Sequence, residues 1–137
     1  MWNGEIYPKL EIMAADPDGP TILAVDDEPD LLDAIRRILT RRGYAVLAAG
    51  DADDAIALCR THTGPIDLLL TDLRMPGTGG RELAAAARQA RPGLPVLYLS
   101  GLADSNSSSD SFDAPVVGKP FTPTGLADAV DAALSAG

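Results

Sequence analysis

The chain has 137 residues, and because 46% of them are hydrophobic it is long enough to bury a single core, so we expect one domain. Its formal net charge of −9 disfavours nucleic acid as a partner, because nucleic-acid phosphates require a basic protein face. The chain has neither an apolar run near the roughly 18 residues of a membrane span nor a signal-peptide pattern, which favours a cytoplasmic protein without membrane contact.

The first residues differ from the rest of the chain. Residues 1–20 show no sustained period and end on Asp-Pro-Asp-Gly-Pro, a cluster of turn-formers and helix-breakers. We interpret them as a flexible N-terminal leader. From Thr21 onward short apolar runs alternate with helical patterns, so the folded domain is expected to span residues 21–136.

The predicted strands and helices alternate along the domain. Short apolar runs bounded by turn-formers predict strands at 21–25, 44–49, 66–71, 94–100 and around 116–117. Apolar residues at three- and four-residue spacing predict helices at 29–43, 52–63, 80–90 and from 123 onward.

Several residues mark the helix ends or the interior. Pro29 suits a first turn, Gly43 a C-terminal stop, and Asp51 can cap the second helix. Cys59 is the only cysteine and lies in that second helix, so it forms no internal disulfide and is expected to be a small buried hydrophobic residue.

This order of elements predicts the fold class. Strands that are apolar on both faces and separated by helices favour a parallel sheet covered on both sides. We therefore expect a flavodoxin-like, doubly wound α/β domain with five parallel strands in the order 2-1-3-4-5. In such folds a ligand binds at the carboxyl ends of the strands, where the strand order reverses.

Polar residues gather at those predicted strand ends. Asp26 and Asp27 follow the first strand and Asp72 the third, Ser100 ends the fourth, and Lys119 follows the fifth. Because the carboxyl ends of parallel strands meet at one edge of the sheet, these side chains are expected to converge. The acidic residues could instead be the solvated start of a helix, but that reading does not explain why Lys119 arrives at the same edge.

Clustered carboxylates repel one another unless a cation neutralises them. Mg²⁺ is a hard ion that binds a few carboxylates and keeps several waters, and it is the predicted cofactor. Asp27 and Asp72 would ligate it directly, the backbone carbonyl of Arg74 would be a third ligand, and Asp26 would act through a water molecule.

Asp72 has a second role available at such a site. A carboxylate beside a metal and opposite an ammonium can attack a phosphoryl group and become an acyl phosphate. The Lys119 ammonium and the Ser100 hydroxyl would then stabilise the charge on the phosphoryl oxygens. His62, the only histidine, is expected far from this site, so the phosphoryl donor must be another protein.

Four motifs together resemble the receiver domain of two-component response regulators. They are ILAVDDEPD (22–30), DLLLTDLRMPGTGG (67–80), LPVLYLSG (94–101) and GKPF (118–121), and they stand in family order over roughly residues 21–136.

The resemblance implies a role for each matching residue. Asp26 and Asp27 are the acidic pair, Asp72 is the phosphoacceptor, Ser100 is the switch hydroxyl and Lys119 binds the phosphate. It also implies a cis bond before Pro120. The implied donor is a sensor histidine kinase or a histidine phosphotransfer protein, and the implied output is an unknown partner protein. The domain is expected to be a regulatory phosphoacceptor module and not an enzyme.

The sequence departs from the family pattern in two places. The position three before the lysine, where the family usually has an aromatic switch residue, holds Val116. Residues 104–111 contain no apolar side chain and consist of types that prefer caps and turns, so the fourth helix is expected to be short or disordered.

Three alternative functions compete with a phosphoacceptor. A haloacid dehalogenase-type hydrolase would need a second aspartate at position 74, which is arginine. A flavodoxin-like cofactor site would need a phosphate-binding loop after the first strand, where Asp26 and Asp27 would repel the phosphate. A receiver-like adaptor that works without phosphorylation is the main alternative: the intact acidic set argues against it, while Val116 and the altered fourth helix leave it open.

Overall fold

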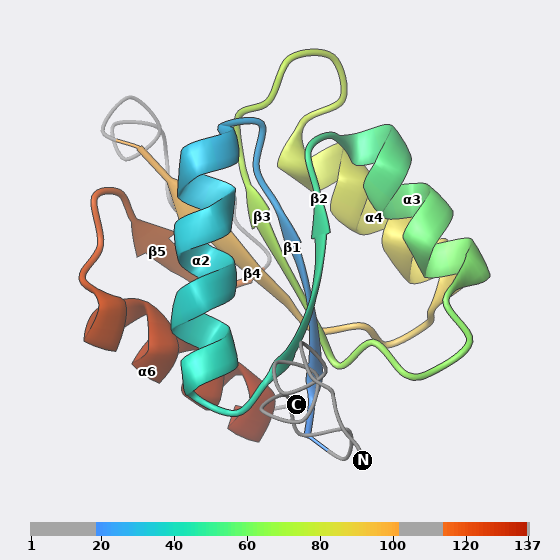
Figure 1. Ribbon diagram of the computed structural model, residues 1–137. Helices are drawn as coiled ribbons and strands as arrows, with labels where there is room; N and C mark the ends of the chain where they lie inside the picture. Colours follow the sequence, from blue (N-terminus) through green and yellow to red (C-terminus); the bar gives the residue numbers. More distant parts are fainter. Residues whose placement is uncertain (1–18, 102–113, 137) are drawn as a thin grey trace, which may run out of the picture.

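The structure is a computed structural model in which residues 19–101 and 114–136 are described. Within them five parallel strands form one sheet in the order β2-β1-β3-β4-β5 (Figure 1). The strands are β1 (Thr21–Val25), β2 (Ala45–Ala49), β3 (Leu68–Asp72), β4 (Val96–Ser100) and β5 (Val116–Gly118). The helices are α2 (Pro29–Arg41), α3 (Ala52–Thr61), α4 (Gly80–Ala90) and α6 (Pro123–Ala136).

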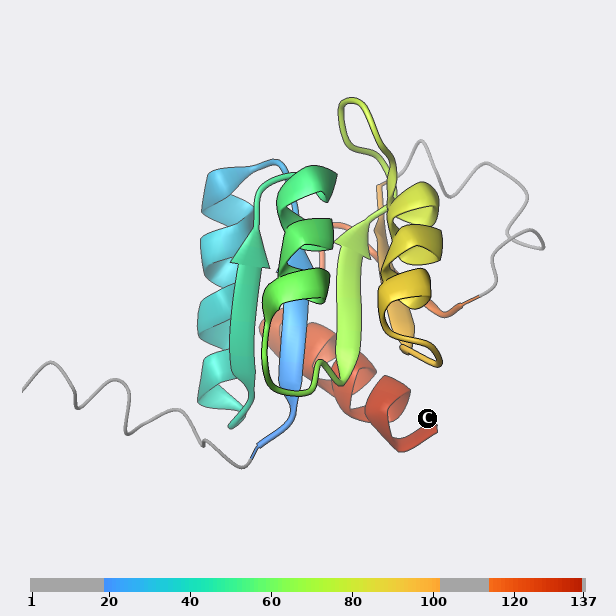
Figure 2. The ribbon, with the colours of Figure 1, turned by 90° about the vertical axis from the view of Figure 1, so that its right-hand side faces the viewer.

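The helices cover both faces of the sheet, as the sequence predicted. Helices α2 and α6 lie on one face and α3 and α4 on the other (Figures 1 and 2). Successive strand residues point to opposite faces, so Ile22 and Ala24 of β1 pack under α2 and α6, while Leu23 and Val25 pack under α3 and α4. The predicted doubly wound fold and its strand order are confirmed.

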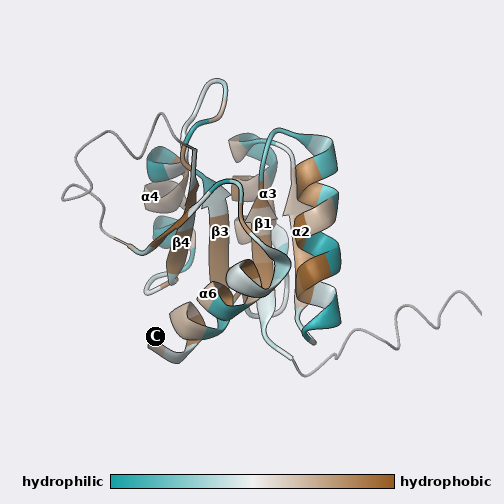
Figure 3. Cartoon of the chain, turned by 90° about the vertical axis from the view of Figure 1, so that its left-hand side faces the viewer, coloured by the Kyte–Doolittle hydropathy of each residue, from teal (hydrophilic) through white to brown (hydrophobic). Residues whose placement is uncertain are grey.

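The central strands are apolar on both faces because both faces are covered. Figure 3 shows the hydrophobic strands β1, β3 and β4 in the interior and the amphipathic helix α2 to one side of them. Burying each leucine of such a core contributes about 1.5–3 kcal/mol relative to exposure, so these strands provide a rigid base for whatever their ends carry. Cys59 belongs to this interior, as predicted, and burial raises the pKa of its thiol.

The predicted roles of Pro29, Gly43 and Asp51 at the helix ends are confirmed, although α2 and α3 each end two residues before the predicted positions 43 and 63. Helix α2 begins at Pro29, and after it Gly43 adopts a positive φ of 101°. The Gly43 N–H donates to the Thr40 carbonyl at 3.0 Å and the Tyr44 N–H to the Leu39 carbonyl at 3.1 Å, which is the Schellman arrangement. The Asp51 side chain caps α3 by accepting from the Asp54 N–H at 2.8 Å.

Three strands begin later than predicted, at 45, 68 and 96 instead of 44, 66 and 94. Ile66 and Leu94 are buried but precede the ladder, because apolar packing begins before the backbone pairing does. Strand β3 also extends one residue further than predicted, so Asp72 is its last residue.

Two interpretations concern segments outside the described residues. They are residues 1–18 of the predicted leader, which spans residues 1–20, and the segment 102–113, where the fourth helix is expected to be short or disordered. Within the described ranges no helix has the length and apolar character needed to cross a bilayer.

Arg91 is a structural residue that the sequence did not single out. It follows α4, and its guanidinium donates to three backbone carbonyls at the end of α3 and in the loop beyond it. The acceptors are Cys59 at 2.9 Å, Gly64 at 2.9 Å and His62 at 2.6 Å. Because a helix end leaves carbonyls without intrahelical partners, this one side chain fixes the loop that leads into β3.

We predict that Arg91→Lys lowers the free energy of unfolding by about 2 kcal/mol, because an ammonium cannot replace a planar fork that reaches three carbonyls. Urea unfolding followed by circular dichroism measures the change. The exposed Arg60 of α3 supplies the control, since Arg60→Lys should leave stability within about 0.5 kcal/mol. Equal stability of the two variants would show that the Arg91 bonds contribute nothing.

Candidate functional site

The ends of four strands bring the predicted site residues to one edge of the sheet. Asp26 directly follows β1, Asp72 ends β3, Ser100 ends β4, and Lys119 directly follows β5. Backbone hydrogen bonds extend the ladder past these ends: the Asp26 N–H donates to the Ala49 carbonyl at 3.2 Å and the Lys119 N–H to the Ser100 carbonyl at 2.7 Å. The side chains therefore start from fixed backbone.

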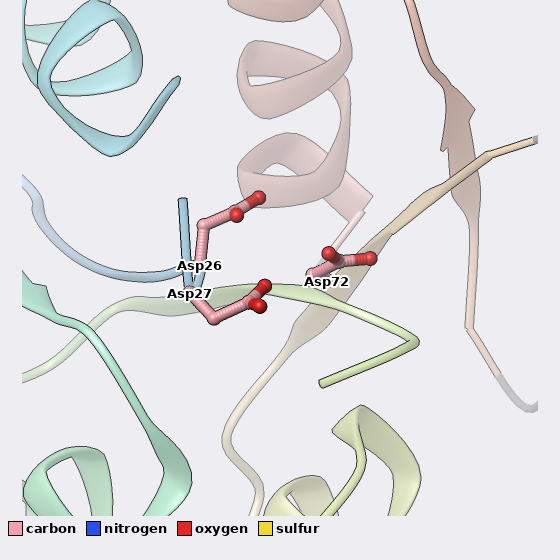
Figure 4. A group of neighbouring side chains, drawn as sticks. All are labelled: Asp26, Asp27 and Asp72. Carbon is pink, nitrogen blue, oxygen red and sulfur yellow. The ribbon is translucent and has the colours of Figure 1, made fainter. Parts of the chain in front are cut away.

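Three aspartates form an acidic cluster at this edge of the sheet. Asp26, Asp27 and Asp72 each offer a carboxylate oxygen, and the three oxygens lie within 4.8 Å of one another (Figure 4). Asp26 is completely buried and Asp72 is 5% exposed, whereas Asp27 is exposed to solvent. The cluster is therefore dry on one side and open on the other.

Lys119 lies against the two buried carboxylates. Its ammonium Nζ donates to Asp72 Oδ2 at 3.0 Å and to Asp26 Oδ2 at 3.5 Å, and it is 3.9 Å from Glu28 Oε1. This places one cation among the clustered negative charges, but it leaves the cluster with an excess of negative charge.

Two backbone N–H groups hold the buried carboxylates in place. The Glu28 N–H donates to Asp26 Oδ1 at 2.9 Å, and the Arg74 N–H donates to Asp72 Oδ1 at 3.2 Å. Each carboxylate is thus bonded through one oxygen to the backbone two residues ahead and through the other to Lys119, and its orientation is fixed without any ligand.

The charges of the cluster shift two pKa values. Burial raises the pKa of Asp26 above 3.8, and the neighbouring charges of Asp72 and Asp27 raise it further, against the opposing effects of the Glu28 N–H and Lys119. Burial alone would lower the pKa of Lys119, but its hydrogen bond to Asp72 and the charges of Asp26 and Asp72 outweigh burial and raise it. The site is thus short of positive charge, and Lys119 is held firmly protonated.

Gly80 is a site residue that the sequence analysis missed. It is the first residue of α4, and a Cβ on it would lie 2.4 Å from the Asp72 carbonyl oxygen, which is closer than two such atoms can approach. Only glycine therefore lets α4 begin against the backbone of the central aspartate. The signal was present in the sequence as Gly79-Gly80, but without the fold nothing linked it to Asp72.

The remaining predicted residues surround the cluster. Ser100 is 3% exposed and its Oγ donates to the Gly101 carbonyl at 3.3 Å. The Lys119–Pro120 peptide bond is cis, the isomer that the resemblance implied. Val116 is 38% exposed, and the Arg74 side chain is exposed while its N–H bonds Asp72. The metal-ligand role of the Arg74 carbonyl stays a prediction.

A mainly apolar groove adjoins the cluster. It has a volume of about 450 Å³ and lies where the start of α2 meets the loop between β5 and α6. Its lining residues are Glu28, Leu31, Lys119, Pro120 and Phe121. Since Lys119 belongs to both the groove and the cluster, a protein seated in the groove would lie directly beside Asp72.

The donor set fits a hard divalent cation. All three clustered ligand atoms are carboxylate oxygens, the type that Mg²⁺ prefers, and the exposed Asp27 leaves an open side for water. Burial raises the pKa of Asp26, and the neighbouring charges of Asp72 and Asp27 raise it further, which is the repulsion that a bound cation would relieve. A softer metal would require thiolate or imidazole ligands, and within the described residues neither belongs to the cluster.

Comparisons with known proteins agree on one family. A family model described as the response regulator receiver domain matches residues 22–131. A putative two-component response regulator of Arabidopsis thaliana, ARR21, is 34% identical over 117 residues, which is 83% of this chain and 19% of that protein. The probable transcriptional regulatory protein TcrX of Mycobacterium tuberculosis is 36% identical over 63% of this chain and 36% of its own length.

Solved structures extend the likeness to the fold. A response regulator receiver protein from Sinorhizobium medicae is 34% identical with a TM-score of 0.76, over 87% of this chain and 97% of its own. The receiver domain of the hybrid histidine kinase CckA is 32% identical with a TM-score of 0.71, over 83% of this chain and 98% of its own. The chain spans less than half the length of the curated relatives compared above, but nearly all of these single domains.

We predict that Asp26→Asn stabilises the metal-free protein by about 0.5–2 kcal/mol at pH 7, because it removes a buried negative charge from a cluster that repels it. The gain should disappear as the pH falls through the raised pKa of Asp26, since the wild-type carboxyl is then neutral as well. Urea unfolding at several pH values in the presence of EDTA tests this. A loss of stability at pH 7 would contradict the proposed repulsion.

Proposed function

This chain belongs to the response regulator receiver domain family, and we propose that it is a phosphoacceptor that receives a phosphoryl group on Asp72 from the phosphohistidine of a partner protein. The observation that carries the proposal is the contact of Lys119 Nζ with Asp72 Oδ2 at 3.0 Å inside the acidic cluster. The ammonium lies closer to Asp72 than to Asp26, at 3.0 Å against 3.5 Å, and such a cation can stabilise the charge of a phosphoryl group transferred onto Asp72.

The transfer would exchange one bond for another at phosphorus. A carboxylate oxygen of Asp72 bonds to phosphorus while the phosphorus–nitrogen bond of the donor histidine breaks, which leaves an acyl phosphate on Asp72. Lys119 would move from the carboxylate to the new phosphoryl oxygens and neutralise them. The Ser100 hydroxyl, now bonded to the Gly101 carbonyl, would donate to another of those oxygens.

Asp26, Asp27 and Asp72 would hold the magnesium ion, together with the Arg74 carbonyl and water. When bound, the ion supplies positive charge that lets the clustered carboxylates and an incoming phosphoryl group share one site. The chain itself contributes a fixed orientation of Asp26 and Asp72, through their bonds to the Glu28 and Arg74 N–H groups.

We propose a sensor histidine kinase or a histidine phosphotransfer protein as the donor. The only histidine of this chain, His62, is the C-cap of α3, and the end of that helix lies at the edge of the sheet opposite Asp72. The apolar groove beside Lys119 gives a partner a seat next to the phosphoacceptor. The phosphoryl group stays on the chain's own side chain, so the domain is a regulatory module and not an enzyme.

Phosphorylation-independent binding is the competing function. Val116 is exposed at the position where the resemblance expects an aromatic switch residue, so a signal carried by rotation of an aromatic side chain is not available there. The two functions differ in whether the Asp72 cluster responds to a phosphoryl group, and one titration separates them.

We predict that beryllofluoride, which mimics a phosphoryl group, binds the Mg²⁺-loaded protein and shifts the NMR signals of Asp26, Ser100 and Lys119. The mimic requires the Asp72 carboxylate, so Asp72→Asn should abolish all three shifts. Asp53→Asn, on the exposed face of α3, is the control and should respond like wild type. An unresponsive wild-type protein would favour the phosphorylation-independent adaptor.

We predict that Asp27→Asn weakens Mg²⁺ binding by about tenfold or more, because it removes a charged ligand from the open side of the cluster. Isothermal titration calorimetry with magnesium chloride measures the affinity without any phosphoryl donor. Unchanged affinity would show that the ion, if bound, lies away from Asp27.

A further inference from the structure

Helix α2 separates its charges by sign along its length. Both acidic residues, Asp30 and Asp33, lie in its first two turns, and its basic residues follow them. Those basic residues are Arg36, Arg37 and Arg41. Because helix ends favour charges of these signs, the helix dipole explains part of the pattern. It does not explain the surface that lies beside these charges.

That surface is a groove between α2 and α6, with a volume of about 630 Å³. Its lining includes the small or apolar side chains of Ala34, Ile38 and Ala127. The same groove is lined by Asp30 towards the start of α2 and by Arg41 at its end. Small residues at the centre let another helix approach closely, and charges at the two ends can orient it.

Among the described residues, the charged residues at the two ends of the groove lack the ion pairs that the charged residues between them form. Asp33 forms ion pairs with both Arg36 and Arg37, the latter at 3.0 Å. Asp30 and Arg41 are exposed, and in the part of the chain that the structure describes neither forms an ion pair or a side-chain hydrogen bond. The groove therefore offers one unpaired negative charge and one unpaired positive charge, eleven residues apart on a single helix.

The groove keeps its shape through contacts away from the phosphoacceptor. Arg42 forms ion pairs with Asp131 and, at 3.4 Å, with Asp128, and the Tyr44 hydroxyl donates to Asp131. Burial and this bond to Asp131 raise the pKa of Tyr44 to about 12, so it remains a donor at physiological pH. The end of α2 is thereby tied to α6 by contacts that do not involve Asp72.

We propose that a second copy of this chain docks on this groove, with the two α2 helices antiparallel about a two-fold axis. In that arrangement Asp30 of each copy faces the partner's Arg41, and the axis passes midway between Ala34 and Arg37, which both line the groove. A surface whose two ends carry opposite charges is complementary to itself when one copy is reversed, which is the requirement of a two-fold interface. The two helix dipoles also oppose each other favourably.

The dimer is expected to be weak. A helix of 13 residues is about 20 Å long, so the interface falls at the small end of specific protein contacts. Two chains of net charge −9 also repel each other, and this repulsion is largely screened at about 0.15 M salt, where the Debye length is about 8 Å. Dimerisation should therefore appear at micromolar to millimolar protein concentration.

Sedimentation equilibrium of the full chain in about 0.15 M salt tests the proposal. Wild type should follow a monomer–dimer equilibrium, and Asp30→Arg and Arg41→Asp should each weaken it at least tenfold by placing like charges together. The double variant carrying both changes restores opposite charges across the axis and should regain most of the affinity. Restoration by the double variant is the result that a nonspecific effect cannot produce.

Matched controls come from α3, on the opposite face of the sheet. Asp53→Arg and Arg60→Asp make the same charge changes at exposed positions and should leave the dimer unchanged. Circular dichroism checks the fold, and Asp30→Asn and Arg41→Gln provide milder variants, each expected to weaken the dimer severalfold.

Three results would overturn the proposal: a monomeric wild type, equal effects of the α3 controls, or a double variant as weak as the single ones. The inference goes beyond the proposed function, since neither Asp30 nor Arg41 belongs to the acidic cluster. Beryllofluoride binding measured on the same variants keeps the two apart. A wild-type protein that does not bind beryllofluoride would contradict phosphorylation but not the dimer. A wild-type protein that binds beryllofluoride but stays monomeric would contradict the dimer but not phosphorylation.

Discussion

The buried repulsion between Asp26 and Asp72, held by Lys119, is the interaction on which the rest of the site depends. Two carboxylates with almost no solvent exposure share a single ammonium, and the exposed Asp27 adds a third negative charge. Such an arrangement costs stability unless a further cation or its equivalent joins it. This cost has a physical use if the excess of negative charge serves to bind a cation.

The fold is what makes this arrangement possible. Groups that repel each other stay this close only where their backbone is held rigidly. Here that backbone belongs to strands β1 and β3, whose apolar residues are completely buried on both faces. The close start of α4 at Gly80 and the backbone donors at Glu28 and Arg74 complete the support. The stability of the core thus offsets the cost of the charged edge.

The acidic cluster and the groove between α2 and α6 occupy different parts of the molecule. The acidic cluster occupies the edge of the sheet, whereas the charge-sorted helix α2 and its groove with α6 occupy a side that the Arg42 and Tyr44 contacts hold in shape. The two regions meet at the start of α2, where Glu28 and Leu31 line the groove beside Lys119. A partner seated near Asp72 and a copy seated along α2 would therefore be close neighbours.

The sequence by itself determined the fold class and the identity of the clustered residues, because both depend on local patterns, and the expected strand order followed from that fold class. Two-sided apolar runs require a covered parallel sheet, and a polar residue at the end of such a run has only one edge to occupy. Asp26, Asp72 and Lys119 could be named on this basis alone. Helix ends were equally local, as Gly43 and Asp51 show.

Only the tertiary structure decided the features that join distant parts of the chain. Nothing near Arg91 in the sequence indicates that it bonds carbonyls at Cys59, His62 and Gly64, and nothing near Gly80 indicates the carbonyl of Asp72 beside it. The groove between α2 and α6 likewise exists only once the helices pack. Periodicity records which face of an element is buried, but the partners of a side chain depend on how several elements are brought together in space.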